Sequence, residues 1–133
     1  MMRHTYLRHV VRFRMKATSS STDKRVLLLG SGFVSGPVVE YLTRNENIHV
    51  TAVSAIKQEA DRLAAANPRT TPILLDVTRS QTELDKLIRE HDCVVSLLPF
   101  SLHPDVAALC IKNRRHLVTT SYVSPKMKAL HDE

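Results

Sequence analysis

The sequence predicts an α/β fold, in which about five parallel strands form a doubly wound sheet in the order 3-2-1-4-5 with helices on both faces. Two observations support this fold. Short apolar runs alternate with longer segments of helical periodicity, which is typical of β-α-β units. The first apolar run also stops at a glycine-containing turn that leads directly into a helical segment. Because right-handed crossovers join successive strands in parallel, these elements form one sheet with both faces covered.

The individual elements follow from local patterns. The first strand, 25–29, is rich in Leu and stops at Gly30. A later helix is amphipathic, because Leu84, Leu87 and Ile88 share one face and charged residues occupy the other. In chain order, the predicted strands are 25–29, 48–53, 72–76, 93–98 and 116–119, and the predicted helices between them are about 33–44, 57–66, 80–90 and 104–113.

The positive charge of the chain is concentrated at its N-terminus. The 133 residues carry a net charge of +6, of which residues 1–24 contribute +5 and the remaining 109 contribute +1. A nucleic-acid-binding domain is expected to carry basic residues on its folded surface, so we predict no nucleic-acid partner. No run of 18 apolar residues occurs, so a transmembrane helix and a membrane partner are not predicted either.

Residues 1–23 form a leader, and 24–133 form a single domain. The leader is rich in Arg and Ser and has no acidic residue before Asp23, a composition typical of a mitochondrial transit peptide. Its arginines do not gather on one helical face, and a basic linker is the alternative. The two cysteines, Cys93 and Cys110, lie in apolar segments and are predicted to be buried, reduced thiols without a disulfide or metal role.

The turn after the first strand has the chemistry of a phosphate-binding loop. Gly30 permits a tight turn, and Gly32 lets a phosphate approach the backbone, because neither has a Cβ. Ser35 stands where a third glycine is usual, Gly36 follows it, and Pro37 forfeits one helical hydrogen bond. Free N–H groups at the start of the next helix would then face the anion. We predict a Rossmann-like dinucleotide site, with a glycine turn that binds nothing as the alternative.

The ends of the second and third strands leave the choice between NAD and NADP open. Ser54 and Lys57 could bind a 2′-phosphate, whereas Glu59 could accept hydrogen bonds from the ribose hydroxyls. For Lys57 the alternative is an ordinary solvent-exposed helix residue. Asp76 ends the third strand with Val77 behind it, and contacts the adenine or caps the next helix.

Two further strand ends reach the same edge of the sheet. Leu98 ends the predicted fourth strand and Pro99 follows it, beside the topological switch point where ligands bind in such folds. After the fifth strand, Thr120, Ser121 and Tyr122 present two hydroxyls and a phenol to the cleft.

Three segments carry a family resemblance. Gly30-Ser-Gly-Phe-Val-Ser-Gly-Pro37, Ser96-Leu-Leu-Pro-Phe100 with His103-Pro104, and Val118-Thr-Thr-Ser-Tyr-Val-Ser-Pro125 occur in the order found in the saccharopine dehydrogenase/reductase family. The chain resembles that family from about Lys24 to Glu133, which is the whole predicted domain.

The resemblance implies an oxidoreductase of lysine metabolism that uses NAD or NADP to convert saccharopine to glutamate and aminoadipate semialdehyde. A bifunctional member of the family is mitochondrial, which favours a mitochondrial over a cytoplasmic location. By matching motif positions, the resemblance implies that Ser31, Gly32, Phe33 and Val34 line the pyrophosphate, Asp76 and Val77 the adenine, Leu98 and Thr120 the nicotinamide ribose, and Ser121 and Tyr122 the saccharopine.

Family members continue into a large substrate domain, whereas this sequence stops at Glu133. We therefore expect part of an enzyme that does not turn over saccharopine by itself. A non-catalytic nucleotide-binding fragment is the alternative. A short-chain-type reductase is a weaker one, because Tyr122 and Lys126 match its Tyr-x-x-x-Lys pair but Pro125 interrupts the helix that this pair needs. His103 is a candidate general base or a helix-flanking residue without a catalytic role.

Overall fold

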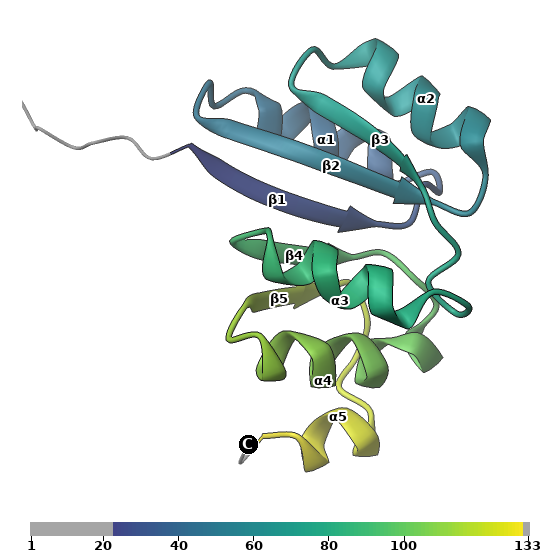
Figure 1. The fold of residues 1–133 in the computed structure, drawn as a ribbon, viewed down its shortest axis with the longest axis vertical. Helices are drawn as coiled ribbons and strands as arrows, with labels where there is room; N and C mark the ends of the chain where they lie inside the picture. Colours follow the sequence, from purple (N-terminus) through teal and green to yellow (C-terminus); the bar gives the residue numbers. More distant parts are fainter. Residues whose placement is uncertain (1–22, 132–133) are drawn as a thin grey trace, which may run out of the picture.

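A computed structural model describes residues 23–131, which form one five-stranded sheet in the predicted order β3-β2-β1-β4-β5 (Figure 1). All four strand pairs are parallel. The elements in chain order are β1 Lys24–Leu29, α1 Ser35–Thr43, β2 Ile48–Ser54, α2 Lys57–Ala66, β3 Thr70–Leu74, α3 Gln81–Arg89, β4 Cys93–Ser96, the 3-10 turn η1 Phe100–Leu102, α4 His103–Lys112, β5 His116–Thr119 and α5 Pro125–Ala129.

The central strand β1 is buried on both faces, as its apolar run predicts. Leu27 and Leu29 belong to a core that also contains side chains of α3 and α4, whereas Val26 and Leu28 belong to a second core with side chains of α1 and α2. Successive residues of a strand point to opposite faces, so one Leu-rich run supplies both cores. The chain therefore changes from one face of the sheet to the other in the crossover from β3 to β4. Because β4 then pairs with β1, the carboxyl ends of β1 and β4 form the switch point.

The third and fourth strands differ from their predicted bounds. The predicted strand 72–76 is wrong by two residues, because Thr70 to Leu74 pair with Val50 to Ser54 and β2 ends at Ser54. Asp76 therefore follows the strand rather than ending it. Pro72 is tolerated inside β3 because β3 is an edge strand.

The predicted strand 93–98 is also too long. β4 stops at Ser96 because its partner β1 ends at Leu29, and the last hydrogen bond runs from the Leu97 N–H to the Leu29 carbonyl at 2.8 Å. Leu98 is therefore part of the loop at the sheet edge, where it is free to line a site.

The first helix begins two residues later than predicted, at Ser35, so Phe33 and Val34 belong to the turn. Pro37 then occupies the third helical position, where an N–H has no partner within the helix, and it forfeits no hydrogen bond, contrary to our expectation. The predicted helix 57–66 matches α2 at both ends.

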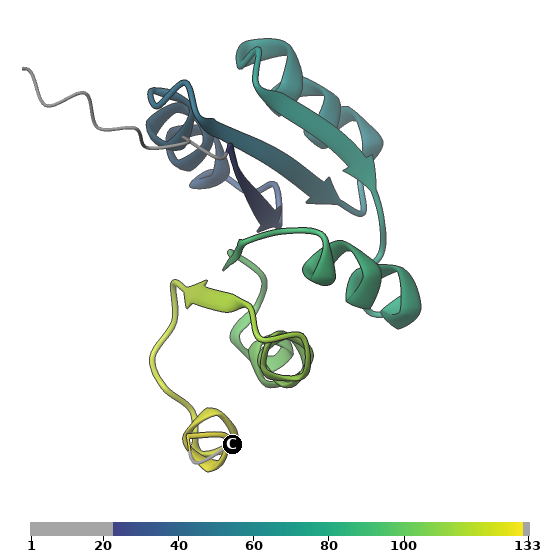
Figure 2. The same cartoon turned by 60° about the vertical axis from the view of Figure 1, so that its left-hand side comes forward.

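The C-terminal part of the described chain adds α5, which packs beside α4. Figures 1 and 2 both show it at the opposite end of the molecule from β3 and α2. No helix among residues 23–131 is long and apolar enough to span a membrane. The predicted leader lies almost wholly outside the described residues.

His91 and Cys110 add a polar ring and a thiol to the buried interior. His91 is 1% exposed, with its Nδ1 2.6 Å from the Leu87 carbonyl and its Nε2 2.7 Å from the Thr51 hydroxyl. Both cysteines are free thiols, as predicted, but only Cys110 is buried, while Cys93 is partly exposed on the short strand β4.

Candidate functional site

The glycine turn between β1 and α1 is held against the end of β4. Gly30 has a φ of 103°, a conformation that side chains rarely adopt, and its N–H donates to the Val53 carbonyl at 3.0 Å. A Cβ at this position would lie 3.3 Å from both the carbonyl carbon and the oxygen of Leu97. Only glycine therefore fits between the two strand ends.

The next residues expose their backbone amides. Within residues 23–131, no protein acceptor takes the N–H of Ser31, Gly32, Phe33 or Val34. A Cβ built on Gly32 meets nothing within 4 Å, so the space beside this residue is open. Ser35 is fully buried, as a close contact between α1 and the sheet requires. Free amides at a helix N-terminus beside open space are the donor set that a diphosphate needs, so these residues fit such a group.

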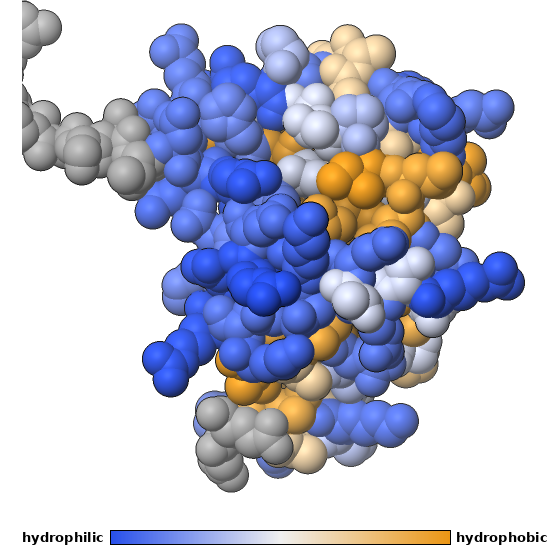
Figure 3. All heavy atoms as spheres, in the orientation of Figure 1, coloured by the Kyte–Doolittle hydropathy of each residue, from blue (hydrophilic) through white to orange (hydrophobic). Residues whose placement is uncertain are grey.

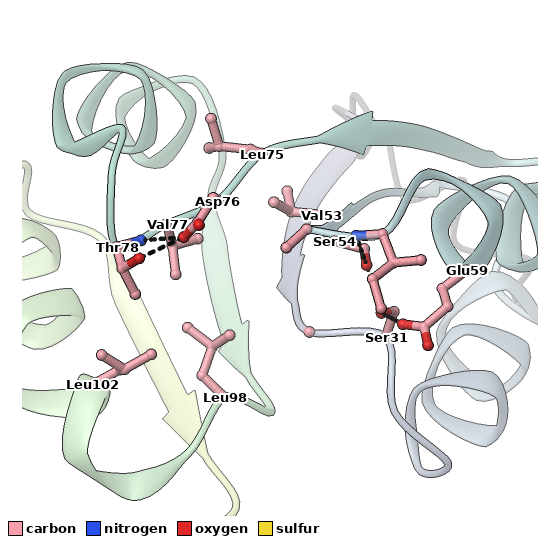
Figure 4. Close-up of a pocket in the computed structure, with 13 residues that line it drawn as sticks. Ser31, Val53, Ser54, Glu59, Leu75, Asp76, Val77, Thr78, Leu98 and Leu102 are labelled. Atoms are coloured by element: carbon pink, nitrogen blue, oxygen red, sulfur yellow. Dashed lines mark hydrogen bonds between the residues drawn. The ribbon is translucent and has the colours of Figure 1, made fainter.

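A cleft of about 260 Å³ opens beside this turn, at the carboxyl edge of the sheet. In Figure 4, Ser31, Ser54 and Glu59 lie on one side of the cleft, and the loop that follows β3 lies on the other. Figure 3 shows that apolar side chains gather on this face between the ends of β2 and β3 and helix α3. The cleft is lined by Gly30, Ser31, Val53, Ser54, Ala55, Ile56, Glu59, Leu75, Asp76, Val77, Thr78, Leu98 and Leu102.

On the β2 side, a chain of hydrogen bonds fixes the polar groups. The Ile56 N–H donates to the Ser54 hydroxyl at 2.9 Å, and the hydroxyl oxygens of Ser54 and Ser31 lie 2.7 Å apart. The Ser31 hydroxyl in turn donates to the Glu59 carboxylate. The glycine turn, the tip of β2 and the first turn of α2 are thereby joined at one corner of the cleft.

On the β3 side, Asp76 forms a turn rather than a helix cap. Its Oδ1 accepts the Thr78 hydroxyl at 2.6 Å and the Thr78 N–H at 2.9 Å, and Ser80 occupies the N-cap position of α3 instead. These two hydrogen bonds, with a smaller effect of the Arg79 charge, lower the pKa of Asp76 from its ordinary value. The side chain is thus an anion at neutral pH, placed at the cleft wall to accept a hydrogen bond.

The structure brings together six of the predicted site residues in this one cleft, namely Gly30, Ser31, Ser54, Asp76, Val77 and Leu98. Gly32 and Phe33 line a neighbouring hollow between the starts of α1 and α2. The other predicted residues, which line neither hollow, are Val34, Thr120, Ser121 and Tyr122.

The segment after β5 has its own arrangement. His103 is 1% exposed, and its Nδ1 lies 2.7 Å from the Ser121 hydroxyl, so this histidine supports Ser121 from the interior. Tyr122 is 99% exposed. Because α5 begins at Pro125, Tyr122 and Lys126 do not share a helical turn, and the short-chain reductase alternative lacks its reacting pair.

Six residues of the cleft were not identified as site residues from the sequence: Val53, Ala55, Ile56, Leu75, Thr78 and Leu102. Thr78 carries a recognisable signal, because an Asp followed two residues later by Thr is a common local turn. Leu102 has no such sequence signal, because it lies in η1 and reaches the cleft only through the tertiary position of the segment that follows β4. No cluster of His, Cys, Asp or Glu in the described part of the chain could hold a metal ion.

Comparison with known proteins identifies the family. The family model described as "Saccharopine dehydrogenase NADP binding domain" matches residues 26–133. The chain belongs to this family. The predicted resemblance and the predicted NAD(P) cofactor are thereby confirmed, whereas the roles of the individual cofactor-binding residues stay predictions.

Individual relatives support the same family assignment. The chain is 44% identical over 119 residues to mitochondrial alpha-aminoadipic semialdehyde synthase of Mus musculus, covering 90% of this chain and 13% of that protein. It is 42% identical over 111 residues to the NADP(+), L-glutamate-forming saccharopine dehydrogenase of Saccharomyces cerevisiae, covering 83% and 24%. The apo structure of the yeast enzyme superimposes with a TM-score of 0.75 at 41% identity, covering 80% of this chain and 24% of that one. The chain thus spans a quarter or less of these relatives.

Proposed function

We propose that this chain is the cofactor-binding part of an enzyme that oxidises saccharopine to glutamate and aminoadipate semialdehyde. The observation that carries the proposal is the set of unpaired amides from Ser31 to Val34 beside the open face of Gly32, at the switch point of a sheet from this family. In the proposed reaction, the nicotinamide cofactor supplies the hydride acceptor. The role of this chain is to hold and orient it.

We assign the roles by position. The amides of the glycine turn hold the diphosphate, the corner formed by Ser54 and Glu59 holds the adenosine ribose, and Asp76 with Val77 borders the adenine. Leu98 and Thr120 border the nicotinamide ribose. Ser121, held by His103, and the exposed Tyr122 face the substrate.

A binding experiment tests the cofactor part. Titration of the full chain with NADH and with NADPH is expected to show binding of at least one, with a rise in Tm. Gly32→Ala places a Cβ in the space assigned to the diphosphate and should weaken binding at least about tenfold, or about 1.4 kcal/mol, while leaving Tm of the free protein unchanged. Gln58→Ala, at an exposed position of α2 that lines neither the cleft nor the hollow beside Gly32, is the control. Equal binding by both variants would contradict the assignment.

A turnover experiment tests the substrate part. Saccharopine-dependent reduction of the cofactor is measured with the chain alone and with the segment that follows the matching region of the yeast enzyme added in trans. We expect activity only with the added segment, and Tyr122→Ala should reduce it without changing cofactor affinity. Cofactor binding with no turnover in either case would favour the non-catalytic nucleotide-binding alternative.

We further propose that residues 1–23 direct a domain of residues 24–133 to mitochondria. The Arg- and Ser-rich composition of the leader supports this location, as do the mammalian relatives that are named mitochondrial. A fluorescent protein fused behind residues 1–24 should co-localise with mitochondria, and the same fusion with the leader arginines changed to Gln should not. Cytoplasmic fluorescence from the unchanged fusion would refute the proposal.

A further inference from the structure

We infer that this site selects NAD(H) over NADP(H), and that Glu59 is the residue that selects. The inference rests on the proposed cofactor site and adds to it a choice that the sequence left open. The two cofactors differ at the 2′ position of the adenosine ribose, where NAD has a hydroxyl and NADP has a phosphate. The question is therefore which charges surround the corner where that ribose lies.

The carboxylate of Glu59 is fixed at this corner. Glu59 is half-buried in the first turn of α2, and its carboxylate accepts the hydroxyl of Ser31, which is itself within 2.7 Å of Ser54 (Figure 4). In doubly wound folds the acid that binds the ribose usually stands at the tip of the second strand, next to this same turn. Here the tip residue is Ala55, which has no polar side chain. The helix supplies the carboxylate that the strand lacks.

Among residues 23–131, no cation lines the cleft to compensate its carboxylates. Of the thirteen residues that line it, none is Lys or Arg, and the two charged ones, Glu59 and Asp76, are both acids. Lys57, the cation nearest to the strand tip in sequence, forms an ion pair with Asp61 at 2.5 Å and its side chain is 72% exposed. A 2′-phosphate would therefore bring close to two negative charges beside a carboxylate.

Two arginines lie nearby but face other groups. Arg79 pairs with Asp76 at 3.5 Å, on the opposite wall of the cleft from Glu59. Arg62 lines the neighbouring hollow beside Gly32 and Phe33, where the diphosphate is assigned. A ribose diol, in contrast, matches the corner as it stands, since its hydroxyls are donors and the Glu59 carboxylate is an acceptor. The carboxylate thus weakens binding of NADP(H) by repelling the 2′-phosphate, and it strengthens binding of NAD(H) by accepting a hydrogen bond from the 2′-hydroxyl.

The test compares the two reduced cofactors on the full chain. Dissociation constants for NADH and NADPH are measured by titration calorimetry at low ionic strength, where charge effects are least screened. We expect NADH to bind at least about tenfold more tightly than NADPH. Glu59→Gln, which keeps the shape and removes the charge, should raise the NADPH affinity about tenfold and lower the NADH affinity a few-fold. Glu46→Gln is the matched control, because it removes the same charge from the turn before β2, at the opposite edge of the sheet.

Each outcome decides the matter. A NADH preference that shrinks in Glu59→Gln and persists in Glu46→Gln supports the inference. Equal or tighter binding of NADPH by the unchanged protein overturns it while leaving the proposed function intact, and so does an equal shift of the ratio in both variants. Absence of binding by either cofactor refutes the proposed function itself. The ratio in the unchanged protein requires no variant, so the inference stays testable if Glu59→Gln does not fold.

Discussion

Replacing Gly30 with alanine tests the geometry on which the site depends. Two costs add at this position. A non-glycine residue at a φ of 103° costs about 1–3 kcal/mol. The new Cβ also lies 3.3 Å from the carbonyl carbon and oxygen of Leu97, which belong to the backbone and cannot rotate away, so a further cost of about 1–2 kcal/mol is expected. The free energy of unfolding of Gly30→Ala should therefore fall by about 2–5 kcal/mol.

Thermal unfolding followed by circular dichroism measures this change. For a domain of this size each kcal/mol corresponds to about 4 °C, so Tm should fall by about 8–20 °C. Gly36→Ala provides the comparison, because its Cβ meets nothing within 4 Å and alanine favours the helix, so its Tm should stay the same or rise by up to about 4 °C. If Gly30→Ala unfolds within about 2 °C of the unchanged protein, the argument from positive φ and close strand packing is wrong.

Three further outcomes are expected. Burial lowers the pKa of His91 in the folded protein below its ordinary value of 6.5. The stability that its neutral ring contributes is therefore complete above pH 6.5 and is lost as the pH falls through the lower folded pKa. Tm should drop between pH 7 and pH 5, and the drop should be smaller in His91→Gln. Burial raises the pKa of Cys110 to about 12, so at pH 8 a thiol reagent should modify the half-buried Cys93 first and Cys110 only on unfolding, as mass spectrometry can show; equal rates would contradict this. Among the described residues, strand β5 pairs only with β4, and Val118 is 52% exposed. Light scattering should therefore detect self-association that Val118→Lys reduces, and a clean monomer at high concentration would refute this expectation.

The strand order could be predicted because alternating apolar and helical segments, with right-handed crossovers, leave few arrangements. Helix α2 was predicted at both ends, since its boundaries depend on nearby residues. The ends of β3 and β4 could not be predicted, because β3 ends where its partner β2 ends and β4 ends where its partner β1 ends. Both partners lie far away in the sequence.

The sequence by itself determined the fold class, the glycine turn and the family, because periodicity, a glycine at a sharp turn and short motifs are local properties of the chain. The tertiary structure alone decided that Glu59, Ser31 and Ser54 meet at one corner and that none of the described residues lining the cleft is a cation. The physical reason is that the charge felt by a ligand depends on side chains brought together across the sheet, and their separation in space cannot be obtained from their separation along the chain.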